Sequence, residues 1–449
     1  MLPPLYTNGR HIVDSNNQRA VLKCVNWYGG HQETRQPGGL HHQPVTNIVQ
    51  SVVSSQFNCV QLPFSTQMVL EGSMQQFDEV VWTSTTANLM VILNSHTNAA
   101  SWCCGVNDCN WVWNNQNYST QDWLNSLEIV TERYRNNSVV VGIDIKNEVH
   151  STLYTLVTWG KSNNPDTDWK AASQLAASVV HTVDADMLIF IQGMCYATEM
   201  TDLYKSPPVF LLSSSKLVLV AHVYAWSYWS MLAEEQYNLS SWAPNTLVWS
   251  GVFSWLFYKG LTEQTSILHV VLNSMCAWGL LSVITVMFYV NTVQSTGCTA
   301  PDSLYISVFP IMGSILAYSA QRRNTQIARL SILCFVCMGV TLFVSIVSVL
   351  SGRGMLFTVN VKNSIDTPDR ETPLFLGEFG TDQYKGISDS QYLHHVTQYL
   401  AQEQLSWAYW ALNGDRWSQN DGKYLREDFG LMDKTWTNMS ESRLVALNI

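Results

Sequence analysis

Two acidic side chains follow directly on apolar strand patterns. Glu148 ends the run VVVGIDIKNE at residues 139–148, whose apolar positions indicate a strand buried on both faces. Glu378 stands one glycine beyond the apolar run PLFL at residues 373–376. An acidic group at the tip of a buried strand is costly unless the strand opens into a pocket. We therefore expect both carboxylates to face a polar cavity.

Two carboxylates on opposite sides of a cavity can act on a sugar bound between them. A retaining glycosidase needs such a pair about 5 Å apart, with one group as nucleophile and the other as acid/base. The nucleophile must stay ionised, and its charge, with partial burial, raises the pKa of the partner carboxyl so that it holds a proton. Glu148 and Glu378 are the candidates for this pair.

Six further apolar runs have the length of buried strands, and polar or aromatic residues follow them. These runs are residues 20–25, 58–62, 89–93, 187–191, 217–221 and 405–409. At or just beyond their ends stand Trp27, Gln61, His96, Gln192, His222, Tyr224 and Trp410. Histidine and tyrosine side chains can orient a carboxylate or a sugar hydroxyl, and their recurrence at strand ends favours one shared site.

Helix-length stretches, such as residues 121–134 and 169–183, separate most of the strands. Strands that alternate with helices predict right-handed crossovers and a parallel sheet. Eight such units close into a (β/α)8 barrel of the TIM type, which keeps its active site at the carboxyl ends of the strands. The alternative, an open doubly wound sheet, would need a glycine-rich phosphate loop after an early strand, and none is present.

Composition narrows the partners and the compartment. The net charge of −10 and the lack of basic runs argue against nucleic acid, and 18 tryptophans suit sugar rings as well as a large core. The four N-glycosylation sequons indicate an extracellular or lumenal chain. They are at Asn117, Asn136, Asn238 and Asn438. Cys103, Cys104 and Cys109 crowd one loop without a histidine at metal-ligand spacing, which favours a local disulfide over zinc. We expect neither a metal nor a cofactor.

A hydrophobic middle interrupts the barrel pattern between its sixth and seventh strands. Residues 266–290, 304–320 and 330–351 carry no formal charge and have about the length of membrane spans. Both flanks must close one barrel, so the number of spans must be even. Either residues 243–258 form a short fourth span, or one of the three segments does not cross. A misassigned gene segment is a further alternative.

The predicted organisation is therefore a (β/α)8 barrel interrupted by a transmembrane helical insertion. Residues 1–242 supply strands one to six, residues 243–351 the insertion, and residues 352–449 strands seven and eight. Three arginines mark the loop between the last two spans as cytoplasmic, which leaves the catalytic domain extracellular or lumenal. They are Arg322, Arg323 and Arg329. No secretory signal pattern follows Met1, so either the N-terminus is missing or an internal span directs export.

Several stretches together resemble the cellulase family, family 5 of the glycoside hydrolases. They are LKCVNWYGG (22–30), FNCVQLPFS (57–65), LNSHTNAASWCC (93–104), GIDIKNE (142–148), HVYAWS (222–227), FLGEFGTD (375–382) and SWAYWALNG (406–414). The matching stretches lie at both ends of the chain, in the order that the family has. The resemblance implies a (β/α)8 retaining hydrolase of β-linked glycans, most similar to an endo-β-1,4-glucanase.

The resemblance also implies roles for single residues. Glu148 matches the family's acid/base and Glu378 its nucleophile. Asn147 matches the residue that binds the sugar 2-hydroxyl, and Tyr224 matches the phenol that bonds the nucleophile. The remaining matches are the active-site histidines His96 and His222 and the stacking platform Trp410. Further candidate platforms are Trp27, Trp102, Trp226, Trp229 and Trp417, for each of which core packing is an equal interpretation.

The chain departs from the family pattern beside the nucleophile. Gln61 stands where the family has an arginine that holds the nucleophile as an anion, so the pKa of the nucleophile should rise. Lys146 and Val149 replace a commoner arginine and proline.

Three functions therefore stay open. The first is a β-glucanase, or a hydrolase of another β-glycan or glycolipid. The second is a membrane-anchored glycan-binding protein that has lost turnover. The third is a protein whose membrane spans are themselves functional and form a channel or an assembly module. The expected partners are a β-glucan polysaccharide or oligosaccharide and the lipid bilayer.

Overall fold

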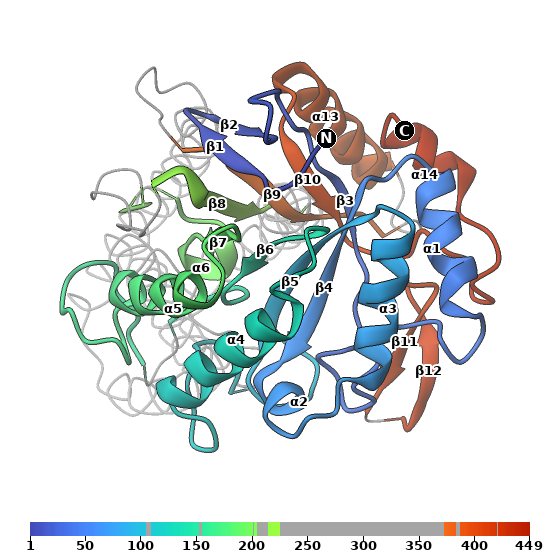
Figure 1. The fold of residues 1–449 in the computed structure, drawn as a ribbon. Coiled ribbons are helices and arrows are strands. Elements are labelled where there is room, and N and C mark those ends of the chain that lie inside the picture. The colour runs from blue at the N-terminus through green and yellow to red at the C-terminus, as the bar shows by residue number, and fades with distance from the viewer. Residues whose placement is uncertain are drawn as a thin grey trace, which may run out of the picture. The chain divides into compact units, whose positions relative to one another are not determined.

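The barrel predicted from the sequence is present (Figure 1). The computed structural model describes residues 1–104, 109–151, 155–200, 202–203, 214–224, 372–382, 387–419 and 421–449. Within them, parallel strands close in the order β10-β3-β4-β5-β6-β7-β8-β9. The strands are β3 (Lys23–Asn26), β4 (Cys59–Ser65), β5 (Met90–Thr97), β6 (Val140–Asp144), β7 (Leu188–Gln192), β8 (Leu217–His222), β9 (Leu374–Phe379) and β10 (Ser406–Tyr409). Each coincides with one of the eight predicted strands, so the strand prediction is confirmed.

Strands β8 and β9 pair in parallel although residues 223–373 separate them in the chain. Their register places Val220 beside Phe375 and His222 beside Glu378. The barrel is thus closed by chain segments from both sides of the hydrophobic middle, as predicted. The described residues of both segments belong to one compact unit, drawn from Met1–Trp229 and Asn363–Ile449.

The predicted membrane spans lie outside the described residues, and so do the predicted boundaries at residues 243 and 351. In the part of the chain that the structure describes, no helix combines the length and the apolar character needed to cross a bilayer. The insertion therefore remains a prediction from the sequence.

Apolar side chains, from cysteine and valine to phenylalanine, form the core of the barrel. A single core cluster contains Cys24, Ile92, Phe190, Val220 and Phe375, all fully buried. A disulfide joins Cys24 on β3 to Cys59, its register partner on β4. Leu5 and Ile12 belong to the same cluster. They come from the N-terminal segment around the hairpin of β1 (Tyr6–Asn8) and β2 (His11–Val13), which therefore packs against the amino ends of the barrel strands.

Amphipathic helices cover the outside of the barrel (Figure 1). The main ones are α1 (Val45–Ser54), α3 (Gln75–Thr86), α4 (Thr120–Tyr134), α5 (Trp169–Val183) and α13 (Ile387–Glu403). Helices α4 and α5 match the predicted ranges 121–134 and 169–183. Both begin at a side-chain cap: Ser119 and Asp122 form a capping box for α4, and the Asp168 carboxylate accepts from the first turn of α5.

Shorter elements complete the described fold. They are α2 (Thr66–Leu70), α6 (Met194–Ala197), the 3₁₀ turn Ser214–Lys216, the hairpin of β11 (Asp415–Ser418) and β12 (Lys423–Arg426), and α14 (Glu441–Ala446).

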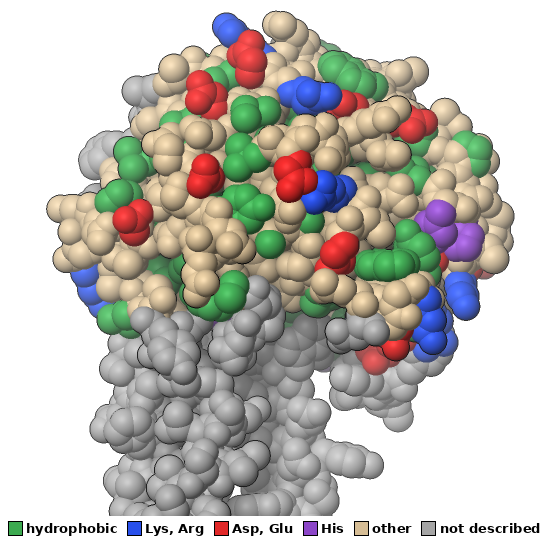
Figure 2. All heavy atoms as spheres, turned by 90° about the horizontal axis from the view of Figure 1, so that it is seen from below, with side chains coloured by type: hydrophobic (Ala, Val, Ile, Leu, Met, Phe, Trp, Pro, Cys, Tyr) green, Lys and Arg blue, Asp and Glu red, His purple; other side chains and the backbone are tan. Residues whose placement is uncertain are grey.

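Acidic and basic side chains are interspersed on the face seen in Figure 2, which carries no continuous patch of one sign.

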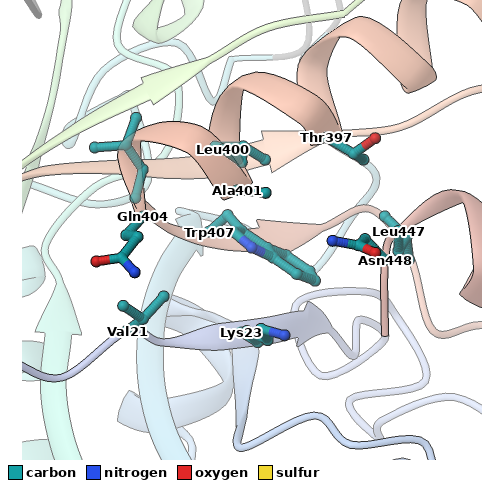
Figure 3. A pocket seen from close by; sticks show the side chains of 10 residues that line it. Val21, Lys23, Thr397, Leu400, Ala401, Gln404, Trp407, Leu447 and Asn448 are labelled. Atoms are coloured by element: carbon teal, nitrogen blue, oxygen red, sulfur yellow. The ribbon is translucent and has the colours of Figure 1, made fainter.

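The two ends of the barrel differ in chemistry. A cavity of about 240 Å³ lies near the starts of β3 and β10, between the strands and α13, and it contains no acidic side chain (Figure 3). Its lining includes Val21, Lys23, Leu400 and Trp407. The buried acidic and histidine side chains gather at the carboxyl ends of the strands instead, where a barrel of this kind places its site.

Candidate active site

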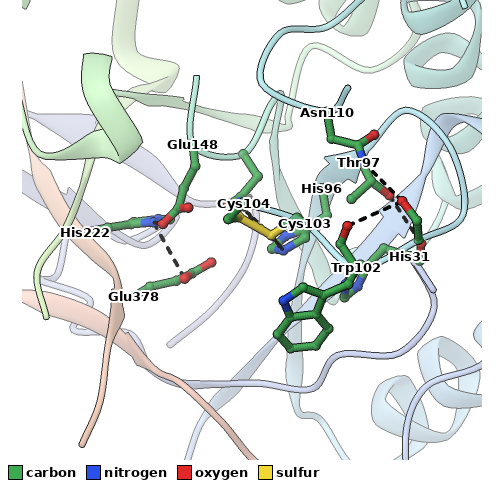
Figure 4. Close-up of a disulfide and its surroundings, with 12 residues drawn as sticks. His31, His96, Thr97, Trp102, Cys103, Cys104, Asn110, Glu148, His222 and Glu378 are labelled. Atoms are coloured by element: carbon green, nitrogen blue, oxygen red, sulfur yellow. Dashed lines mark hydrogen bonds and ion pairs between the residues drawn. A yellow bond between two sulfur atoms is a disulfide. The ribbon is translucent and has the colours of Figure 1, made fainter. Parts of the chain in front are cut away.

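The carboxyl ends of β6, β8 and β9 bring two glutamates and one histidine together (Figure 4). His222 Nδ1 lies 2.9 Å from Glu148 Oε1 and 3.7 Å from Glu378 Oε2. One side-chain oxygen of each glutamate and a ring nitrogen of His222 lie within 4.8 Å of one another. This separation fits the carboxyl pair of a retaining glycosidase, which needs about 5 Å, and leaves no room for the water of an inverting enzyme.

Glu148 is held in place through its backbone. Its φ of 46° is unusual for a residue other than glycine. Its N–H donates to Gln192 Oε1 over 2.7 Å, and Gln192 Nε2 donates to Asp144 Oδ2 (2.7 Å) and Asn147 Oδ1 (3.1 Å). The end of β7 therefore fixes the turn that carries Glu148. Gln192 and Asp144 were not assigned a role from the sequence, although Gln192 shares the strand-end position that marked the other site residues.

Glu378 has a poorer set of partners. The Tyr224 hydroxyl donates to Glu378 Oε2 over 2.8 Å, but Glu378 Oε1 is buried without a hydrogen bond from any described residue. The residue before Glu378 must be glycine, because a Cβ at position 377 would lie 2.5 Å from Val220 Cγ1 and 3.0 Å from His222 Nε2. Glycine at position 377 thus lets β8 and β9 approach closely enough for His222 to face both carboxyl groups.

Burial controls the protonation of this cluster. Loss of solvent around Glu378, with the nearby Glu148 charge, raises its pKa to about 8, although His222 and the Tyr224 hydrogen bond act in the opposite direction. Burial lowers the pKa of His222, but the charges of Glu378 and Glu148 outweigh it, and the net direction is upward. Burial raises the pKa of Asp144 to about 7. His222, with its pKa raised, lies between the two carboxyl groups.

Gln61 makes no hydrogen bond to Glu378. It is fully buried on β4, and neither its side-chain oxygen nor its nitrogen has a partner among the described residues. The expected rise in the pKa of the nucleophile agrees in direction with the structure, where burial is its largest cause. No positive charge at position 61 offsets that burial.

His96 and Asn147 are buried close to Glu148. His96 Nδ1 lies 2.6 Å from Asn94 Oδ1, which fixes the proton on Nδ1, and Asn147 Nδ2 lies 3.5 Å from His96 Nε2. Burial, with the charges of His31 and Lys146, holds the pKa of His96 well below its usual value, so the ring is neutral. Lys146 Nζ donates to the His96 carbonyl over 2.8 Å.

A disulfide joins the adjacent Cys103 and Cys104, which confirms the predicted local disulfide. Figure 4 shows this disulfide beside His96. Cys103 Sγ is 3.2 Å from His96 Nε2, and Asn147 Nδ2 lies 3.7 Å from Cys104 Sγ. With both sulfurs in a disulfide, His96, Cys103 and Cys104 do not offer the thiolates of a metal site.

Aromatic rings pack together beside His96, whose ring centre lies 5.7 Å from that of Trp410 in a stacked arrangement. Trp410 stacks on Tyr28 with ring centres 4.9 Å apart, and Trp102 meets the Tyr28 ring edge-on at 5.5 Å. Trp102 is 39% exposed, the most open of these rings. The Tyr28 hydroxyl donates to the buried Glu427, a pair that the sequence did not predict.

The structure corrects one predicted sugar platform. Trp27 is fully buried, and its indole N–H donates to the Gly38 carbonyl over 2.8 Å, so it belongs to the packing and not to the cleft. The reason is the segment that returns to Gly38, whose carbonyl accepts from the one polar group of the Trp27 side chain. Trp417 is half-buried on β11 against Tyr424, while Trp226 and Trp229 lie outside the described residues.

Known proteins share this architecture. The catalytic domain of the major endoglucanase from Xanthomonas campestris has a TM-score of 0.58 at 19% identity, with 99% of this chain and 98% of that chain covered. An endocellulase from Pyrococcus horikoshii, solved in complex with cellotetraose, also has a TM-score of 0.58, at 17% identity and with 100% and 99% covered. At these identities the likeness shows the fold.

Sequence relatives cover the chain more unevenly. A glycosyl hydrolase 5 family protein from Chamaecyparis obtusa is 22% identical over 97% of this chain and 64% of its own length. The major extracellular endoglucanase from Xanthomonas campestris is 29% identical over 42% of this chain and 40% of its own. The chain thus spans between two fifths and two thirds of these relatives. The protein-family model described as Cellulase (glycosyl hydrolase family 5) matches residues 15–261, more than half of the chain, and the chain therefore belongs to this family.

Proposed function

We propose that this chain is a retaining β-glycosidase that acts on β-1,4-glucan in the manner of an endoglucanase. The observation that carries the proposal is the cluster of Glu148, His222 and Glu378, whose reactive atoms lie within 4.8 Å of one another. Family membership and the likeness to endoglucanases support the substrate class.

The reaction follows from the position of each group. Glu378 Oε attacks the anomeric carbon while Glu148 donates a proton to the departing glycosidic oxygen, which leaves a covalent glycosyl–enzyme intermediate. Glu148, now ionised, then removes a proton from a water molecule that attacks the same carbon and releases Glu378. Tyr224 and His222 orient the nucleophile, Asn147 and His96 face the sugar hydroxyls, and Trp410 stacks on the sugar ring.

This mechanism requires an anionic Glu378, whose pKa stands at about 8. In the active form the cluster must therefore carry its proton on Glu148 and keep Glu378 ionised. The ionised fraction of Glu378 grows as the pH rises toward 8, so the acidic limb of the pH–rate profile should lie higher than for a solvated carboxyl.

The test is an activity screen of the purified full chain on β-1,4-glucan, mixed-linkage glucan, mannan and glucosylceramide. Proton NMR of the first product distinguishes the mechanisms, because retention gives the β-anomer before mutarotation and inversion gives the α-anomer. Release of the β-anomer from β-1,4-glucan supports the proposal. Inversion, or turnover of a different substrate alone, contradicts the mechanism or the substrate.

The second candidate is a glycan-binding protein without turnover. The unpaired Gln61 side chain and the protonated Glu378 favour it, since both weaken the nucleophile. It predicts oligosaccharide binding by calorimetry with no product on any of the four substrates at any pH.

We also propose that the protein is a multi-pass membrane protein with its barrel extracellular or lumenal. The uncharged segments of residues 243–351 support the spans. Asn117, Asn136 and Asn438 are exposed, and the Cys24–Cys59 and Cys103–Cys104 disulfides suit an oxidising compartment. Carbonate extraction tests the membrane association, and a mobility shift with an N-glycosidase tests the orientation. A carbonate-soluble, unglycosylated protein would contradict both.

A further inference from the structure

Two histidines and one aspartate converge away from the carboxylate pair. His41 Nε2 lies 3.1 Å and His42 Nε2 3.0 Å from Asp415 Oδ2. The three ligand atoms lie within 4.8 Å of one another. The histidines come from the segment before α1, and Asp415 is the first residue of β11, so the cluster joins two segments that are distant in sequence.

The surroundings hold each member in position. Asp415 is 1% exposed, and its other oxygen accepts a hydrogen bond from Trp436 Nε1 over 2.9 Å. The His41 ring stacks on Tyr424 with centres 3.8 Å apart. The backbone N–H of His42 donates to the Gly39 carbonyl over 2.8 Å. Such outer contacts orient ligands before an ion binds.

Position 39 requires glycine for this arrangement. Its φ of +82° is a left-handed conformation, and a Cβ there would lie 2.3 Å from Trp436 Cδ2. The turn that presents the two histidines therefore packs directly against the tryptophan that holds Asp415.

We propose that His41, His42 and Asp415 form a zinc-binding site. Imidazole and carboxylate ligands suit Zn²⁺, whereas Ca²⁺ and Mg²⁺ prefer oxygen ligands alone. Around a tetrahedral zinc, with bonds of about 2.0–2.2 Å, neighbouring ligand atoms lie about 3.3 Å apart. The observed separations of 3.0 and 3.1 Å need only a small expansion.

The ion can reach this position from solvent. The His41 and His42 side chains are 25% and 34% exposed, while the carboxylate beneath them is closed off. Three protein ligands leave the fourth position to water. The competing arrangement has no ion, with both Nε2 atoms protonated and donating to Asp415. Zinc binding requires the lone pair on each Nε2, so the two arrangements are chemically exclusive.

The site would clamp the loop after β3 to the hairpin after β10. The same two segments meet at Tyr28, whose N–H donates to Asn413 Oδ1 over 3.1 Å and whose carbonyl accepts from Asn413 Nδ2 over 3.0 Å. Tyr28 stacks on Trp410, so the clamp would stabilise that pair of rings without entering the reaction. The inference does not depend on the proposed activity.

The experiment uses the full chain in detergent, treated with EDTA and dialysed, and titrated with Zn²⁺ by calorimetry. We expect one equivalent bound, and a Tm higher by about 3 °C or more when free Zn²⁺ exceeds Kd a hundredfold. Asp415→Asn, and separately the double variant His41→Gln/His42→Gln, should lose the bound equivalent and the shift. Co²⁺ in place of Zn²⁺ should give the visible absorption of a tetrahedral complex.

A matched control comes from α13. His394 and His395 are also an adjacent, exposed pair with ring centres 5.7 Å apart, but no third ligand group joins them among the described residues. His394→Gln/His395→Gln should keep the zinc equivalent. The Glu148–His222–Glu378 cluster is the second possible acceptor of an ion.

Three results would overturn the assignment. The first is no zinc binding by the untreated or EDTA-treated wild type. The second is one equivalent of Zn²⁺ that still binds to His41→Gln/His42→Gln. This result would show that the two histidines act only as hydrogen-bond donors to Asp415. The third is an equivalent that persists in Asp415→Asn and disappears in Glu378→Gln, which would place the ion between the two glutamates.

Discussion

Glu148 and Glu378 lie on either side of one histidine, yet their surroundings differ. Glu148 is in a turn whose backbone is held by Gln192, and its carboxyl group bonds His222 over 2.9 Å. Glu378 is inside a strand, 4% exposed, with Tyr224 on one oxygen and no described partner on the other. The residue proposed to be the nucleophile is therefore the more isolated from water and from hydrogen bonds.

This difference shows how a pair of identical side chains acquires two roles. Each carboxyl group raises the cost of ionising the other, and the one with fewer compensating partners holds its proton more tightly. In this barrel burial raises the pKa of Glu378, which must lose its proton to act. Productive chemistry then depends on groups that stabilise its anion, and position 61 is where the family pattern supplies one.

The largest expected effect comes from removing the nucleophile. Glu378→Gln should lower kcat by about 10⁴-fold or more, because an amide cannot form the glycosyl–enzyme intermediate. Oligosaccharide binding, measured by calorimetry, should stay within about threefold, since the amide keeps the shape of the carboxyl group. Glu132→Gln on the exposed face of α4 is the control. Unchanged turnover in Glu378→Gln would remove this residue from the mechanism.

Removing the acid should give a substrate-dependent loss. Glu148→Ala should slow the hydrolysis of cello-oligosaccharides by about 10²–10⁴-fold, because only a poor leaving group needs the proton. Aryl glycosides with good leaving groups should form the intermediate at nearly the normal rate. Added azide should restore turnover and yield a β-glycosyl azide. Equal losses on both substrates without azide rescue would contradict the acid/base role.

A positive charge placed beside Glu378 should stabilise its anion and so reduce the difference between its surroundings and those of Glu148. Gln61→Arg should raise turnover about tenfold, because a charge-assisted hydrogen bond contributes roughly 1.5–3 kcal/mol to the anion. It should also move the acidic limb of the pH–rate profile downward. Gln61→Met, of similar size and without charge, is the matched control.

The outcome at position 61 separates the two functions. A rapid wild type whose rate and acidic limb do not change in Gln61→Arg would make the glutamine a neutral substitution. Oligosaccharide binding without turnover in both forms would favour the glycan-binding protein.

The smallest expected effect is on stability. Because the folded-state pKa of Glu378 is raised to about 8, its protonated form stabilises the fold fully below the ordinary carboxyl pKa, and this contribution disappears as pH rises toward 8. Relative to Glu378→Gln, the wild type should lose a few degrees of Tm between pH 5 and pH 8. Asp144 titrates in the same window but is present in both proteins, so the difference isolates Glu378. A constant difference in Tm would show that the raised pKa is wrong.

The order and position of the barrel strands could be predicted from the sequence alone. Runs such as residues 187–191 and 217–221 are apolar on both faces, and this local pattern requires a strand buried on both sides. Helices α4 and α5 were predictable for the same reason, because their periodicity and caps are local. The strand-end positions of Glu148 and Glu378 then followed from barrel topology.

Other features depended on contacts between distant segments, and only the tertiary structure decided them. Trp27 and Tyr28 are adjacent aromatic residues and both are fully buried, yet the Trp27 indole N–H bonds the Gly38 carbonyl while the Tyr28 ring stacks on Trp410. The hydrogen bond from the Glu148 backbone to Gln192 cannot be predicted from the spacing of these residues in the sequence. The same is true of the contacts of Asp415 with His41 and His42. The protonation of Glu378 depends on how far water is excluded around it. Burial of that kind is the sum of contacts from several strands, and no single stretch of sequence contains it.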